Sequence, residues 1–130
     1  MIKDILDVAR ALLERRDVMI KNQKERCDLL AKYFEGIADT LQQIAEGFRQ
    51  NLVPRAKIAE MATYAELLPQ SVGSYVELMA VDDLKRRLKQ SQDIDALTSE
   101  VEANREEAIS QIEEASGVFK ALGASCRVHY

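Results

Sequence analysis

The clearest pattern in the chain is a hydrophobic repeat that covers its first third. Steps of alternately four and three residues, counted from Ile2, select fourteen positions, of which twelve are apolar. These positions are Ile2, Leu6, Ala9, Leu13, Arg16, Ile20, Gln23, Cys27, Leu30, Phe34, Ile37, Leu41, Ile44 and Phe48. This spacing predicts helix that packs along one apolar seam.

No proline interrupts this segment, and its first glycine is Gly36. One continuous helix of about 45 residues would be about 70 Å long at about 1.5 Å per residue. Because that is long for a chain of 130 residues, we expect either a break, near residues 16–17 or at Gly36, or two later helices stacked end to end along it. The polar seam residues Arg16 and Gln23 would either fix the register of a partner helix or mark a solvent-facing end.

Two shorter helices are expected next. Asn51 and Pro54 indicate a turn over residues 49–54, since asparagine favours turns and proline suits the first position of a helix. The following helix should cover about residues 54–68 and stop at Pro69. Ser74 and Glu77 have the spacing of a capping box, which predicts a further helix over about residues 75–90.

The last predicted helix begins near residue 94, with Ser91 or Asp93 as its cap, and ends at Gly123. Its seam consists of Ile94, Val101, Ala108, Ile112, Ala115, Phe119 and Leu122. Short loops between the helices predict an all-α fold, an antiparallel bundle of about four helices with a long N-terminal helix, in one domain that spans residues 1–130. The first and last helices should pack together for most of their length.

Composition and charge narrow the function classes. No apolar run approaches the roughly 18 to 20 residues of a membrane-spanning helix, and the opening Met1-Ile2-Lys3-Asp4 does not resemble a signal peptide, so we expect a soluble, cytoplasmic protein. Residues 91–130 carry 3 basic and 8 acidic side chains. This imbalance argues against binding to nucleic acid or to an anionic membrane. The one basic run, residues 85–89, is explained by the negative end of a helix dipole.

The residues offer little material for catalysis. The only histidine is His129, so di-iron, zinc and Ser-His-Asp sites are not expected, and the scattered glycines form no phosphate loop. Cys27 lies on the seam and should be buried, whereas Cys126 should be more accessible. The acidic pairs at residues 106–107 and 113–114 point away from one another on a helix and indicate a solvated face. We therefore expect no enzyme activity, no catalytic residue, no metal site and no cofactor.

Four stretches resemble a helical effector-associated domain of cyanobacterial signalling proteins. They are residues 26–41 (RCDLLAKYFEGIADTL), 53–57 (VPRAK), 64–69 (YAELLP) with Val72 and Gly73, and 113–122 (EEASGVFKAL). Such domains stand beside STAND-type ATPase, protease-like or repeat regions. The resemblance implies a non-enzymatic role in protein interaction, and it supplies no functional residues.

The sequence therefore favours a helical protein–protein interaction module, an adaptor or input domain in intracellular signalling. Its partner would be another protein or a second copy, bound in a homodimer through Leu6, Leu13, Arg16, Ile20 and Gln23. Two alternatives remain open. One is a small-ligand-binding bundle, for which Arg16, Gln23 and Arg105 are the polar seam residues. The other is a membrane-active bundle that exposes an amphipathic end helix.

Overall fold

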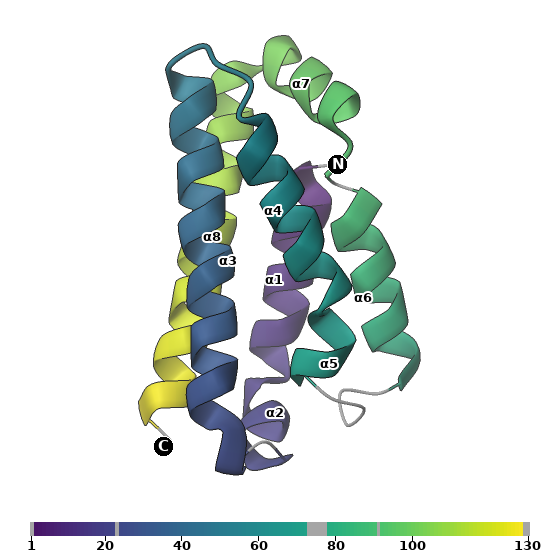
Figure 1. Ribbon diagram of the computed structural model, residues 1–130, viewed down its shortest axis with the longest axis vertical. Coiled ribbons are helices and arrows are strands. Elements are labelled where there is room, and N and C mark those ends of the chain that lie inside the picture. The colour runs from purple at the N-terminus through teal and green to yellow at the C-terminus, as the bar shows by residue number, and fades with distance from the viewer. Residues whose placement is uncertain (1, 23, 73–77, 91, 129–130) are drawn as a thin grey trace.

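The computed structural model describes residues 2–22, 24–72, 78–90 and 92–128 (Figure 1). Their regular elements are α1 (Ile2–Glu14), α2 (Arg16–Asn22), a 3-10 turn η1 (Lys24–Arg26), α3 (Cys27–Arg49), α4 (Arg55–Glu66), α5 (Leu68–Val72), α6 (Leu78–Gln90), α7 (Ile94–Ala103) and α8 (Arg105–Val128). No strand occurs in these four ranges. The predicted all-α class is confirmed, but the described residues form eight α-helices where the sequence predicts about four.

Five helices enclose the core. α8 packs against α3 on one side and α1 on the other, α3 packs against α4, and α6 closes the ring by contacting both α4 and α1 (Figure 1). α5 extends α4 at one end of the molecule, and α7 crosses the opposite end. The α3–α8 contact is the most extensive, so the predicted packing of the first and last helical segments is confirmed for this pair.

The N-terminal helical segment reverses direction before α3 begins. α1 ends beside Arg15, and α2 and η1 then carry the chain to the start of α3, which runs back along the molecule (Figure 1). The side chains of Arg15 and Arg16 donate to the carbonyl oxygens of Ala11 (3.3 Å) and Leu13 (3.2 Å), which the break leaves without a full set of helical partners. The break expected near residues 16–17 is confirmed, whereas Gly36 lies inside α3.

The predicted turn between α3 and α4 is confirmed, but Pro54 is the N-cap of α4 and not its first helical residue. The amide of Leu52 donates to the Gly47 carbonyl (2.9 Å) and that of Asn51 to the Phe48 carbonyl (3.0 Å), which is the Schellman pattern. Asn51 occupies the left-handed region with φ of 62°, a conformation that asparagine tolerates better than most residues. A Cβ atom on Gly47 would lie 2.9 Å from Cβ of Pro54, so the returning chain depends on glycine here.

Two residues predicted to stop helices do not do so, although α4 ends at Glu66, close to the predicted end near residue 68. Pro69 does not stop a helix but lies in the first turn of α5, where its missing amide hydrogen needs no partner. Gly123 does not end α8 either, because the helix continues to Val128 and the glycine is buried against α3. A Cβ atom there would lie 3.3 Å from the Ala31 carbonyl oxygen, so Gly123 allows two helices to approach closely.

The last predicted helix is divided at Asn104. Its backbone leaves the helical region (φ −155°, ψ 88°), and its side-chain oxygen accepts the amide of Glu107 at 3.3 Å, so Asn104 caps α8. The predicted cap of the preceding helix is confirmed, since Asp93 accepts the amide of Ala96 at 3.1 Å. Ser91, Ser74 and Glu77 lie outside the described residues.

The two seams meet in the core. Eleven of the twelve apolar residues of the N-terminal seam are buried, and Leu13 is partly buried. Phe34 on α3 and Phe119 on α8 are fully buried, with ring centroids 6.2 Å apart. Next to them, Ser116 donates to the Ala38 carbonyl at 2.7 Å, which adds a polar contact to an apolar interface.

Candidate functional site

The described part of the chain contains no group of three or more His, Cys, Asp or Glu side chains that could hold a metal ion. His129 lies outside it. Within the same residues, no helix is both long and apolar enough to cross a membrane.

Both cysteines are buried free thiols. Cys27 is buried at the start of α3 as predicted, but the prediction for Cys126 is wrong, because it is 1% exposed. The reason is that α8 extends past Gly123 and carries Cys126 into the interface with α3. Burial, with smaller effects from Cys27 and Glu35, raises the pKa of the Cys126 thiol to about 11.

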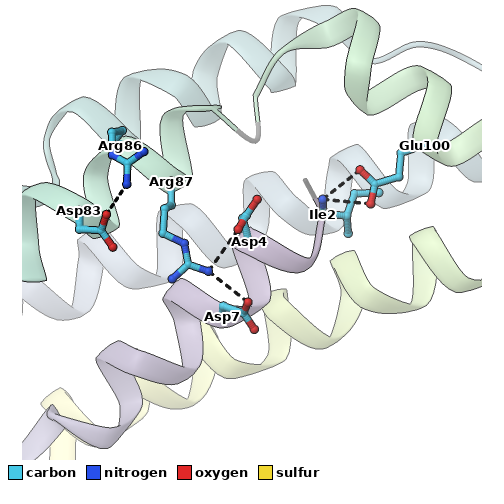
Figure 2. A network of polar contacts seen from close by, with 7 residues as sticks. All are labelled: Ile2, Asp4, Asp7, Asp83, Arg86, Arg87 and Glu100. Carbon is cyan, nitrogen blue, oxygen red and sulfur yellow. Dashed lines mark hydrogen bonds and ion pairs between the residues drawn. The ribbon is translucent and has the colours of Figure 1, made fainter.

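Most of the basic run on α6 is paired with carboxylates of neighbouring helices, and Arg86 pairs with Asp83 on α6 itself. Arg87 donates to Asp4 and Asp7 of α1, each at 3.1 Å, and Figure 2 shows it between them. Lys85 and Lys89 pair with Glu66 of α4. Hydrogen bonds from Lys89 and then Lys85 lower the pKa of Glu66, and the bond to Asp4 raises that of Arg87. The run thus joins α6 to α1 and α4. It also lies near the C-terminus of α6, where basic side chains interact favourably with the helix dipole.

The start of α1 is held by α7. The amide of Ile2 donates to both carboxylate oxygens of Glu100, each at 3.2 Å (Figure 2). A negative side chain at this position also interacts favourably with the positive end of the α1 dipole. Glu100 therefore joins α7 to the start of α1 and stabilises that helix end.

The paired carboxylates of α8 point apart, as predicted. Glu113 forms an ion pair with Arg49 on α3, whereas Glu114 pairs with Arg10 on α1 at 2.6 Å. The pair at residues 106–107 is exposed. The two members of each pair do not converge, although Glu106 and Glu113 line one open pocket together with Arg49 and Arg105.

The seam residues singled out from the sequence lie apart. Arg16 is exposed and bonds the end of α1, and Arg105 donates to the Phe48 carbonyl at 2.5 Å. Gln23 lies outside the described residues. Leu6 and Ile20 are 5% and 7% exposed, so both are mostly covered within one chain, and Leu13 is partly buried. Of the polar seam residues that the structure describes, Arg16 on α2 and Arg105 at the start of α8 do not form a shared polar cavity.

An open groove of about 610 Å³ lies beside the ion pairs of α6. Its lining residues are Asp4, Ala62, Lys89, Gln90, Gln92 and Asp93. Ligand pockets are mostly apolar and enclosed. Because this groove is open and most of its lining residues are charged or carry amides, it is a weaker candidate than an exposed apolar surface.

Three exposed apolar residues lie on elements that share one end of the molecule, namely α2, the first turn of α3 and the last turn of α8. Val18, Leu29 and Val128 belong to these three elements and are 47%, 56% and 81% exposed. Figure 1 shows α2, the start of α3 and the C-terminus of α8 at one end of the molecule, and α2 and α8 are in contact. We call this region the α2 end. It is the best candidate for a functional surface.

The sequence interpretation missed these three residues because it followed only the seam. Val18 and Leu29 stand outside the heptad positions in the N-terminal repeat. An apolar residue that lies outside the helical seam can therefore indicate an interaction surface. Only the fold, however, brings three such residues to one end.

Comparisons with protein-family models, with curated proteins and with solved structures find no match to this chain. The support for the candidate surface therefore comes from the geometry of the chain itself.

Proposed function

We propose that the chain is a non-enzymatic helical interaction module and that it binds a second copy of itself through the α2 end. The observation that carries this proposal is the exposure of Val18, Leu29 and Val128 at one end of the molecule. Exposed apolar side chains gathered in one region favour association, because burying them removes apolar surface from water.

The charges around this surface suit a self-complementary contact. Arg16, Lys21 and Arg127 contribute positive charge, while Asp17 and Asp28 contribute negative charge. In a two-fold dimer each surface faces itself, so a patch that carries both signs can pair with its own copy. The resemblance described above adds the expectation of an adaptor or input role in cytoplasmic signalling.

Of the residues that the sequence predicts for self-association, Arg16 lies on α2 and is exposed. Self-association through Leu6, Leu13, Arg16, Ile20 and Gln23 stays a prediction. Because Leu6 and Ile20 are buried in the single chain, a charge at either position would unfold the protein before it could report on an interface. Val18 and Leu29 are better positions for testing the contact.

Sedimentation equilibrium at chain concentrations up to about 100 μM tests the proposal. Wild type should reach twice the chain mass of 14.7 kDa, and the double variant Val18→Glu/Leu29→Glu should be a folded monomer. Leu52→Glu is the matched control, since Leu52 is 58% exposed in the α3–α4 turn at the opposite end. It should leave the dimer intact. A wild-type monomer at 14.7 kDa throughout, or a dimer that only the control disrupts, would contradict this function.

The small-ligand alternative is supported by the groove beside Asp4 and Lys89. A thermal-shift screen against small molecules tests it: a ligand that raises Tm in wild type and not in Lys89→Ala would favour a binding bundle over an interaction module.

A further inference from the structure

The two thiols of the chain lie on the same helix pair. Cys27 is the first residue of α3, and Cys126 lies in the last turn of α8. Both side chains are buried, at 0% and 1% exposure. In the amino-acid sequence they are far apart, so only the packing of α3 against α8 decides whether they meet.

The contacts along the interface fix its register. Ser116 bonds the carbonyl of Ala38 at 2.7 Å, and the Phe34 and Phe119 rings lie 6.2 Å apart. Further toward the α2 end, the position of a Cβ on Gly123 is 3.3 Å from the Ala31 carbonyl oxygen. The helices are therefore antiparallel, and each step toward the start of α3 matches an equal step toward the end of α8.

The same register places the thiols opposite each other. Cys27 precedes Phe34 by about two helical turns, and Cys126 follows Phe119 by the same distance. Their neighbours confirm the alignment, because Arg127 donates to Asp28 at 3.2 Å. The close approach at Gly123, one turn away, shows that the backbones of α3 and α8 lie near each other beside this pair.

We propose that Cys27 and Cys126 form an intramolecular disulfide when the protein is oxidised, and that this bond ties the start of α3 to the end of α8. This inference rests on the α3–α8 packing and does not depend on the proposed dimer. The pair would act as a modification site for a low-molecular-weight disulfide such as oxidised glutathione.

The chemistry is two successive exchanges. The Cys126 thiol loses its proton to solvent, and the thiolate attacks one sulfur of oxidised glutathione, which breaks that S–S bond and releases one glutathione thiolate. The Cys27 thiolate, formed in the same way, then attacks Cys126 Sγ of the mixed disulfide and releases the second glutathione. The protein loses two protons and two electrons, and the oxidant gains them as two thiols.

Both thiols stand at helix ends, which open more readily than helix centres. The Cys27 thiol donates to the Ile20 carbonyl of α2 at 3.9 Å, so we place the first exchange at Cys126. While α8 is closed, burial keeps this thiol protonated, and Glu35 adds to the effect. The exchange is therefore slow in the resting protein, and it accelerates when the last turn of α8 opens.

Incubation of the full chain with oxidised glutathione at pH 8, followed by intact mass and peptide mapping under non-reducing conditions, tests the proposal. We expect a loss of two hydrogens and one peptide pair linking Cys27 to Cys126. The linked form should unfold at a Tm at least about 5 °C higher, since a cross-link over so long a segment restricts the unfolded chain. Dithiothreitol should reverse both changes.

Cys126→Ala and Cys27→Ala are the matched variants, with circular dichroism as the check on folding. Each should accept glutathione as a mixed disulfide or stay reduced, without the rise in Tm. The wild-type measurement stands alone if a variant fails to fold. Wild type that yields two separate glutathione adducts, or cross-linked dimers, or that forms the bond only in denaturant, would overturn the proposal.

Discussion

Ser116 on α8 donates a buried hydrogen bond to the carbonyl oxygen of Ala38 on α3 at 2.7 Å. This bond joins the middle of two helices whose other contacts there are apolar, including the Phe34–Phe119 pair. The Ser116 hydroxyl meets the Ala38 carbonyl in one register of α3 against α8. The bond therefore favours this register over registers shifted by a helical turn. The register in turn aligns Cys27 with Cys126.

Replacing Ser116 tests the importance of this bond. We expect Ser116→Ala to lower the free energy of unfolding by about 1 kcal/mol, the net value of a typical buried hydrogen bond. Urea unfolding followed by circular dichroism measures it. Ser125→Ala is the control, because Ser125 bonds only the Ala121 carbonyl of its own helix. An equal loss in both variants would show that the contact with α3 adds nothing.

Two glycines of α8 should respond to substitution in opposite ways. Gly117 is exposed, and a Cβ atom there would meet nothing within 4 Å. Gly117→Ala should stabilise the protein by about 0.5 to 1 kcal/mol, because alanine favours helix. Gly123→Val should destabilise it by about 1 to 3 kcal/mol, because its side chain would press on Ala31 and Glu35. Thermal unfolding compares the two, and a stabilised Gly123→Val would contradict the close packing.

The residues that the sequence predicted well are those whose role is set by their own periodicity. The heptad from Ile2 to Phe48 identified the buried face of three helices, α1, α2 and α3. Asp93 caps a helix and Asn51 forms a turn, as their local sequence predicts. Each of these predictions depends only on residues that are close in the sequence, so it holds even where the N-terminal helix is broken.

The residues that it predicted poorly depend on contacts between distant segments. Glycine is typical of helix ends, so the sequence predicts that Gly123 ends a helix. In the structure Gly123 instead allows α8 to approach α3 closely. Its misassignment also placed Cys126 in a tail instead of the core. The α2 end gathers Val18, Leu29 and Val128 from three elements, and no local pattern connects them.

Large residues of the predicted seam should carry much of the stability. Phe34 and Leu41 are both fully buried, so Phe34→Ala and Leu41→Ala should each cost about 2 to 5 kcal/mol through lost burial and the cavity left behind. Glu106→Ala is the exposed control and should change little. Chemical denaturation gives the three values. A surface change more costly than the core changes would show that the seam is assigned to the wrong face.

Acid should weaken the contact between α3 and the end of α8. Arg127 donates two hydrogen bonds to Glu35, each at 2.7 Å, and these lower the pKa of Glu35 below its ordinary 4.5. The pKa of Asp28 is also lowered, first by a hydrogen bond from Lys32 and then by Arg127. A carboxyl whose folded pKa is lowered stabilises the protein above its unfolded pKa and loses that contribution as the pH falls through the folded value.

The difference in unfolding free energy between wild type and Arg127→Gln should therefore be constant near pH 7 and shrink below pH about 4.5. The groups are exposed, so the difference should be small and should fall further in high salt. Lys120→Gln removes an equal charge from the exposed face of α8 and serves as the control. Urea titrations between pH 3 and 7 compare the three proteins. If Arg127→Gln and Lys120→Gln follow the same pH dependence, the loss reflects net charge alone and not the pairing of Arg127 with Glu35.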